Sequence, residues 1–222
     1  MTKNLRVPYG LSVHGGEEIR AVTKVLKSST QMGKNVSIFE KKVSKLFDKK
    51  FGLMVNSGSS ALLLAMETLD FPPGSEIITP VLTFSTTVGY IVRNNWVPVF
   101  VDVKEGTYCI NEDKIKSLIT KKTKALVAPH LMGNIVNWDR IAPILKKRGI
   151  LIIEDSADTL GATYKKKSTG HHADISITSF YGSHIINCAG NGGALTLNSK
   201  KFLYKAKLLR SWGRSCLLYT SD

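Results

Sequence analysis

The sequence lacks the features of several protein classes. It has only three cysteines (Cys109, Cys188 and Cys216), whose spacing fits neither a metal site nor a disulfide framework. No stretch approaches about 18 uncharged apolar residues, and residues 1–8 contain no apolar core of a signal peptide. These absences predict a cytoplasmic protein that binds no metal through its cysteines and has no membrane partner.

Acidic residues are also scarce. The chain has 17 Asp and Glu against 31 Lys and Arg, which gives a net charge of +14. The lysines occur as doublets along predicted helix faces, for example at 41–42 and 146–147, and not in one tract with aromatic residues. We interpret them as a solvated surface, with a polyanion-binding patch as the alternative, and expect no nucleic-acid partner. A basic surface is also compatible with an anionic nucleotide sugar.

The pattern of apolar residues predicts an α/β fold. A chain of 222 residues with 43% hydrophobic content can bury the core of one domain. Two amphipathic helices come first, with apolar faces at Ile19, Val22 and Leu26, and at Phe39, Val43, Leu46 and Phe47. Predicted strands follow at 52–56, 76–79, 98–103, 124–130, 150–155, 174–180 and 193–197, and helices at 59–69, 86–93, 112–119, 138–147 and 200–211. This alternation predicts right-handed crossovers and a mainly parallel, mixed sheet with helices on both faces.

The turn at residues 56–62 has the sequence Asn-Ser-Gly-Ser-Ser-Ala-Leu and joins a predicted strand to a buried helix. Backbone N–H groups and hydroxyls at a helix N-terminus bind phosphate well. Glycine makes the turn possible and allows a ligand to approach closely. The turn therefore predicts a phosphate site, and the alternative is an ordinary capped strand–helix turn.

Asp155 ends the apolar strand at 150–155. In open α/β sheets, ligands bind at the carboxyl ends of strands. A carboxylate there can accept a hydrogen bond from a protonated pyridine nitrogen and so keep the ring an electron sink. A helix cap or an ion pair is the alternative. Phe84, which follows the strand at 76–79, is on its own either a core residue or a ring-stacking residue.

His184 ends the run Ser179-Phe180-Tyr181-Gly182-Ser183-His184, and the glycine-rich turn at 190–193 follows it. This turn precedes a strand, which argues against a dinucleotide-binding fingerprint. A single histidine after a strand is often structural. Its position after Ser179 and downstream of Asp155 favours a site residue. His130, at the end of the strand at 124–130, is either substrate-facing or structural.

These motifs together resemble the DegT/StrS family of sugar aminotransferases, which use pyridoxal phosphate (PLP). The resemblance implies the large domain of a fold type I aminotransferase. It also implies a role for each matched residue. Gly58, Ser59, Ser60 and Ser179 would bind the cofactor phosphate, Phe84 would stack on the ring, Asp155 would hold the ring nitrogen, and His184 would stand where the family has its Schiff-base lysine. Asp158 is also expected to bind the cofactor; it replaces the usual glutamine or histidine, as in the family's nucleotide-4-keto-6-deoxyhexose 3-dehydratases.

The missing lysine determines the expected reaction. Imidazole forms no Schiff base but transfers protons near neutral pH. The resemblance therefore implies 3-dehydration of a nucleotide-4-keto-6-deoxyhexose in deoxysugar or lipopolysaccharide biosynthesis, with pyridoxamine phosphate (PMP) condensed on the sugar ketone and His184 as the base. Glutamate would be the amino donor. A [2Fe–2S] cluster is possible but not favoured, because no Cys-x-Cys pattern follows Trp212-Gly213-Arg214.

Two alternatives remain. One is a sugar aminotransferase that uses another lysine, for which Lys200 and Lys201 are the nearest downstream. The other is a catalytically silent PLP-binding protein. The resemblance also implies a homodimer. We expect residues 1–215 to be the PLP-binding large domain, the N-terminal part of a longer enzyme. Residues 216–222 resemble translated sequencing adaptor more than protein.

Overall fold

A computed structural model describes residues 5–8, 10–11 and 13–215 of the chain, and the interpretation of 216–222 as an artefact lies outside them. Seven strands form one sheet in the order β1-β9-β8-β5-β4-β2-β3. Their bounds are β1 Phe51–Val55, β2 Glu76–Pro80, β3 Val97–Val101, β4 Thr123–Pro129, β5 Leu151–Asp155, β8 Ile175–Ser179 and β9 Gly193–Leu197. All neighbouring pairs are parallel except those of β9, which runs antiparallel to β1 and β8. The predicted α/β class with a mainly parallel, mixed sheet is confirmed.

Seven α-helices accompany the sheet in the described residues. They are α1 Gly16–Ser28, α2 Lys34–Leu46, α3 Gly58–Glu67, α4 Ser85–Arg93, α5 Glu112–Leu118, α6 Trp138–Lys147 and α7 Lys200–Arg210. The predicted helices and strands are each found within about two residues of their expected ends, as sequence signals for boundaries usually allow. None of the described helices is long and apolar enough to cross a membrane.

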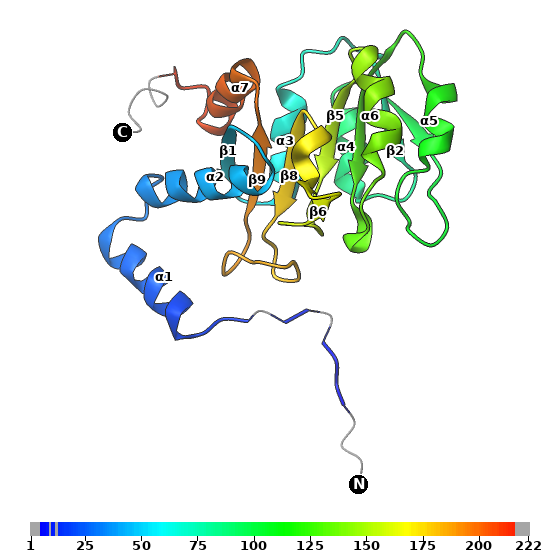
Figure 1. Cartoon of the computed structure of the whole chain (residues 1–222). Coiled ribbons are helices and arrows are strands. Elements are labelled where there is room, and N and C mark those ends of the chain that lie inside the picture. The colour runs from blue at the N-terminus through cyan, green and yellow to red at the C-terminus, as the bar shows by residue number, and fades with distance from the viewer. Residues whose placement is uncertain (1–4, 9, 12, 216–222) are drawn as a thin grey trace.

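Side chains from β5 show how the sheet acquires a core on both faces. Ile153 packs into the cluster that contains α3, α4 and α7, whereas Ile152 packs into the cluster with α5 and α6. Successive side chains of a strand point to opposite faces, so a buried parallel strand needs an almost continuous apolar run. Figure 1 shows the resulting three layers, with α2 and α6 on one side of the sheet and α3 and α4 on the other.

Helix α1 differs from the other helices because none of its residues is buried. Figure 1 shows it standing away from the sheet and its covering helices. The predicted apolar face exists, but Ile19, Val22 and Leu26 are 63%, 46% and 67% exposed. The amphipathic pattern thus predicted the helix correctly, while the face it would bury is open in this chain.

A small hairpin of β6 (Thr163–Tyr164) and β7 (Lys167–Ser168) was not predicted from the sequence. Hairpin turns of this kind usually carry Asn or Gly, because both central residues need positive φ. Here Lys165 and Lys166 occupy them, with φ of 48° and 65°. Without a turn residue in the sequence, no local signal indicated the hairpin.

Candidate active site

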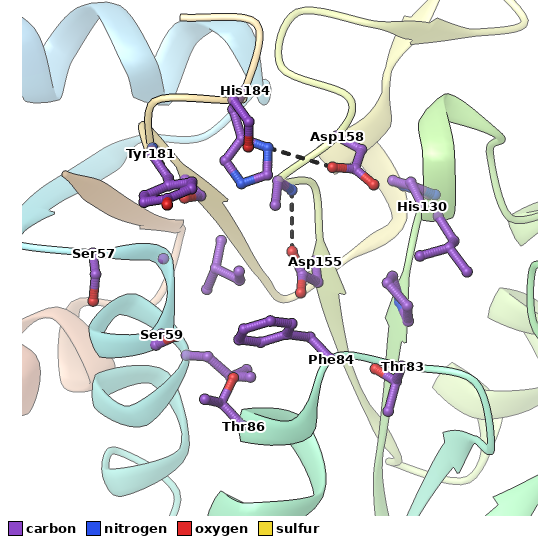
Figure 2. A pocket seen from close by; sticks show the side chains of 18 of the residues that line it. Ser57, Ser59, Thr83, Phe84, Thr86, His130, Asp155, Asp158, Tyr181 and His184 are labelled. Atoms are coloured by element: carbon purple, nitrogen blue, oxygen red, sulfur yellow. Dashed lines mark hydrogen bonds and ion pairs between the residues drawn. The ribbon is translucent and has the colours of Figure 1, made fainter. Parts of the chain in front are cut away.

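The candidate site lies at one edge of the sheet, where the carboxyl ends of the six like-directed strands meet. The antiparallel strand β9 begins at the same edge with Gly193. A cavity of about 720 Å³ opens there. Its lining includes seven of the eight predicted site residues: Gly58, Ser59, Phe84, Asp155, Asp158, Ser179 and His184. Figure 2 shows five of these side chains, which come from α3, the start of α4, the end of β5 and the segments after β5 and β8: Ser59, Phe84, Asp155, Asp158 and His184.

Ser60 is the predicted residue that does not line this cavity; it lines a second, more open one beside α7. Its backbone N–H donates to Ser57 Oγ at 3.0 Å, and its hydroxyl accepts from the same Ser57 hydroxyl, also at 3.0 Å. Ser57 is the N-cap of α3. The structure therefore places Ser60 in the capping of the helix, which satisfies one of the N–H groups that a helix start leaves open.

The start of α3 lies directly against Ser179 at the end of β8. A Cβ added to Gly58 would come within 2.7 Å of Ser179 Cβ, closer than real carbon atoms approach. Only glycine therefore allows the helix start and the Ser179 hydroxyl to share one wall of the cavity. The partial positive charge of the helix N-terminus and the hydroxyls of Ser59 and Ser179 together form a cradle suited to an anion.

Asp155 forms the base of the cavity at the end of β5. Its Oδ1 accepts the N–H of Ala157 at 3.0 Å. Burial and, to a smaller extent, the nearby charge of Asp158 together raise the pKa of Asp155 to about 6, against the lowering effect of the Ala157 hydrogen bond. A buried carboxylate with a raised pKa is stabilised by a cationic partner, so this position favours a protonated ring nitrogen.

His184 and Asp158 face each other across the cavity mouth (Figure 2). His184 Nδ1 lies 3.4 Å from Asp158 Oδ1. The second carboxylate oxygen, Oδ2, accepts the N–H of Met132 at 2.9 Å. The hydrogen bond with His184 is the main reason that the pKa of Asp158 lies below its usual value. The pair directs the other ring nitrogen, Nε2, away from Asp158 and makes it available for proton transfer.

Phe84 is the N-cap residue of α4 and is 64% exposed at the cavity. This exposure excludes the core interpretation, and an exposed ring at the cavity mouth is available for stacking on a planar ligand. His130 is the opposite case: it is among the residues around the cavity, but its side chain has no exposed surface. The substrate-facing interpretation of His130 is thus not supported by the structure.

Residues 13–219 match the model of the DegT/DnrJ/EryC1/StrS aminotransferase family. The chain belongs to this family. A dTDP-4-dehydro-2,6-dideoxy-D-glucose 3-dehydratase from Saccharopolyspora spinosa is 36% identical over 94% of the chain and 47% of its own length. The lipopolysaccharide biosynthesis protein RfbH of Salmonella typhimurium is 36% identical over 95% of the chain and 50% of its own length.

Among solved structures, a GDP-4-keto-6-deoxymannose-3-dehydratase with a trapped PLP–glutamate adduct matches with a TM-score of 0.91. The two sequences are 30% identical, and the match covers 96% of this chain and 57% of the dehydratase chain. The chain thus spans about half the length of the curated relatives that it matches. The family and the PLP aminotransferase fold are confirmed, as is the expected cofactor class, PLP or PMP, for the family.

The residues that line the cavity of this chain fit PLP or PMP. The anion cradle at α3, the carboxylate at the cavity base and the exposed ring at the cavity mouth match a phosphate, a protonated pyridine nitrogen and an aromatic plane, respectively. Each follows from local geometry: the Gly58–Ser179 approach, the raised pKa of Asp155 and the exposure of Phe84.

Several lining residues were not predicted as site residues. They are Ser57, Leu62, Leu82, Thr83, Thr86, Pro129, His130, Leu131, Ala157, Ile177, Tyr181, Ser183, Asn191 and Gly192. Six of them lie within three residues of the end of a predicted strand: Ser57, Leu82, Leu131, Ala157, Tyr181 and Ser183. Extending each predicted strand by three residues at its carboxyl end would have identified these six, since the carboxyl ends of parallel strands share one edge.

Proposed function

We propose that the full-length protein is a PLP/PMP-dependent 3-dehydratase of a nucleotide-4-keto-6-deoxyhexose, acting in deoxysugar or lipopolysaccharide biosynthesis. One observation carries this proposal. The cavity that fits the cofactor is lined by His184, and none of the described residues that line it is a lysine. The similarity to two 3-dehydratases over nearly the whole chain supports it.

When bound, the cofactor supplies a ring that withdraws electrons from the carbon bearing its amine. The chain's own residues then have separate tasks. The start of α3, with Ser59 and Ser179, would hold the phosphate. Asp155 would keep a proton on the ring nitrogen, and Phe84 would stack on the ring. His184 accepts a proton at Nε2 and returns it, while Asp158 holds Nδ1 and stabilises the imidazolium.

The aminotransferase alternative requires a lysine amine at the cofactor. Lys200 and Lys201 begin α7, directly after β9. Because β9 runs against β8, its last residue Leu197 pairs with Ile175 at the start of β8, so α7 begins at the opposite edge of the sheet from the cavity. An aminotransferase would therefore need a lysine from another part of the full-length protein or from a second subunit.

Borohydride treatment of the PLP-loaded full-length protein, followed by mass spectrometry, tests the proposal. We expect no covalently attached cofactor, and conversion of bound PLP into PMP when glutamate is added. His184→Lys is the matched control, in which reduction should attach the cofactor to the new lysine. A phosphopyridoxyl group on any lysine of the wild type would favour the aminotransferase. Unchanged sugar turnover in His184→Ala would remove His184 from the chemistry.

The cluster-free subtype is the form we propose. Glutamate then supplies the electrons that removal of the C3 hydroxyl requires, and 2-oxoglutarate should accumulate in step with the 3-deoxy sugar. About two iron atoms per chain in the purified full-length protein would instead indicate a [2Fe–2S] enzyme.

We also infer a homodimer. The exposed apolar face of α1, formed by Ile19, Val22 and Leu26, supports it, since contiguous apolar surface commonly marks an interface. Light scattering should give twice the mass of one full-length chain. A monomeric mass at micromolar concentration would contradict this inference.

A further inference from the structure

His130 follows β4 beside the cavity, and its buried ring packs against Trp138 in a T-shaped arrangement at a centroid distance of 5.9 Å. Its two ring nitrogens have different surroundings. Nδ1 accepts the backbone N–H of Val136 at 3.0 Å, whereas Nε2 lies 3.4 Å from Glu154 Oε2. Because an N–H group points at Nδ1, that nitrogen carries a lone pair and the ring proton is on Nε2, facing the carboxylate.

Glu154 is a fully buried carboxylate on the face of β5 opposite to Asp155. Ser156 Oγ donates to its Oε1 at 2.6 Å. Burial alone would raise the pKa of Glu154, but His130, Ser156 and the charge of Lys49 together lower it. Lys49 is itself buried and donates to the carbonyls of Gly170 and Ala173. Glu154 is therefore an anchored, charged acceptor, held in place independently of the cavity.

The backbone between His130 and Val136 connects this buried pair to the catalytic histidine. Met132 lies in the middle of the turn at φ +56°, a conformation that costs a non-glycine residue about 1 kcal/mol or more. Its N–H donates to Asp158 Oδ2 at 2.9 Å. A strained turn keeps its shape only when its ends are fixed, and the Val136–His130 hydrogen bond fixes one end.

We propose that His130 is a positioning residue, which fixes the turn at 131–136 so that Met132 holds Asp158 against His184. This role rests on the proposed function, because it acts on the proton transfer assigned to His184. Substrate contact is not the role of His130, since the side chain has no exposed surface. The ring acts through Nδ1, which accepts the Val136 N–H. The Glu154 carboxylate favours the ring proton on Nε2 and so leaves Nδ1 as the acceptor.

Two substitutions of similar size separate the functions of the ring nitrogens. In His130→Asn the amide oxygen occupies the position of Nδ1 and still accepts the Val136 N–H. In His130→Gln the amide reaches towards Glu154 and leaves Val136 without its acceptor. Tyr164→Phe is the matched control, because the Tyr164 hydroxyl donates to Asn137 Oδ1 at 2.7 Å beside the same turn but is not linked to Asp158.

In the full-length protein we expect kcat to fall about tenfold in the Gln variant and less than about threefold in the Asn variant, as expected for loss of one buried hydrogen bond. The KM for the nucleotide sugar should change less than about twofold in both, because the ring does not contact substrate. Crystal structures should show the Met132–Asp158 hydrogen bond kept in Asn and lost in Gln. Tyr164→Phe should retain both the hydrogen bond and the wild-type kcat.

Equal impairment of the Asn and Gln variants would overturn the proposal, as would an intact Met132–Asp158 hydrogen bond in the Gln variant. A raised KM with unchanged kcat would indicate substrate contact instead. If the Gln variant does not fold, the Asn variant still tests the proposal: loss of its Met132–Asp158 hydrogen bond would overturn it. If the wild type fails to dehydrate any sugar, the proposed function fails, while the crystal structures still decide whether His130 fixes the turn.

Discussion

Replacing Asp155 by asparagine should stabilise the cofactor-free protein while weakening its hold on the cofactor. Burial, with a further contribution from Asp158, raises the pKa of this carboxyl from 3.8 to about 6. At about 1.36 kcal/mol per pKa unit, keeping Asp155 ionised in the folded protein costs roughly 3 kcal/mol above pH 6. Asparagine carries no charge, and its side-chain oxygen can still accept the N–H of Ala157.

The sign of the pH dependence follows from the raised pKa. Between about pH 4 and pH 6 the folded wild type retains a proton that the unfolded chain has already released. Its free energy of unfolding should therefore decrease as pH rises through this window and level off above it. The asparagine variant lacks this contribution. It should match the wild type near pH 4 and exceed it by about 3 kcal/mol at pH 8.

Urea unfolding of the cofactor-depleted full-length protein, followed by tryptophan fluorescence at several pH values, measures this difference. Adding PLP should reverse the order at pH 8, because ligand binding stabilises only a protein that binds it well. A constant difference between variant and wild type at all pH values would refute the reasoning. So would a wild type that is the more stable of the two above pH 6 without cofactor.

Three further predictions concern single contacts. Asp158→Asn removes the charge that holds His184. We expect kcat to fall about tenfold or more in steady-state kinetics, while cofactor titration should give a nearly unchanged PLP dissociation constant. Gly58→Ala forces a methyl group against Ser179, and urea unfolding should show a loss of about 1–3 kcal/mol together with weaker PLP binding. Lys166→Gly removes a residue at positive φ and should add about 1 kcal/mol in the same assay, without changing kcat.

The position of the site could be predicted from the sequence because it depends on strand ends. Asp155, Ser179 and His184 each come at or just after an apolar run, and parallel strands bring such ends together. The role of Asp158 was harder to predict. Its pairing with His184 depends on how two loops 26 residues apart fold over the cavity, and no periodic pattern records that approach.

Ser60 and His130 show a second limit. Ser60 belongs to the same small-residue turn as Ser59, but the helix begins so that one hydroxyl lines the cavity and the other takes part in the cap. His130 stands at a strand end like the site residues, yet its ring turns into the core, where Nδ1 accepts the Val136 N–H and Nε2 lies 3.4 Å from Glu154 Oε2. The position of a residue at a strand end predicts the edge of the sheet at which it lies. The direction of its side chain depends on the groups that it packs against.

The antiparallel strand β9 has a consequence for how the chain is made. Strand β1 is bonded to the rest of the sheet only through β9, with Phe51 opposite Leu197. Strand β1 leads directly into α3, which carries the anion cradle. During synthesis, β1 can therefore join the sheet only after nearly 150 more residues have left the ribosome. The first cofactor contacts along the chain are thus among the last to form, and a nascent chain that ends before Gly193 has no complete site to offer the cofactor.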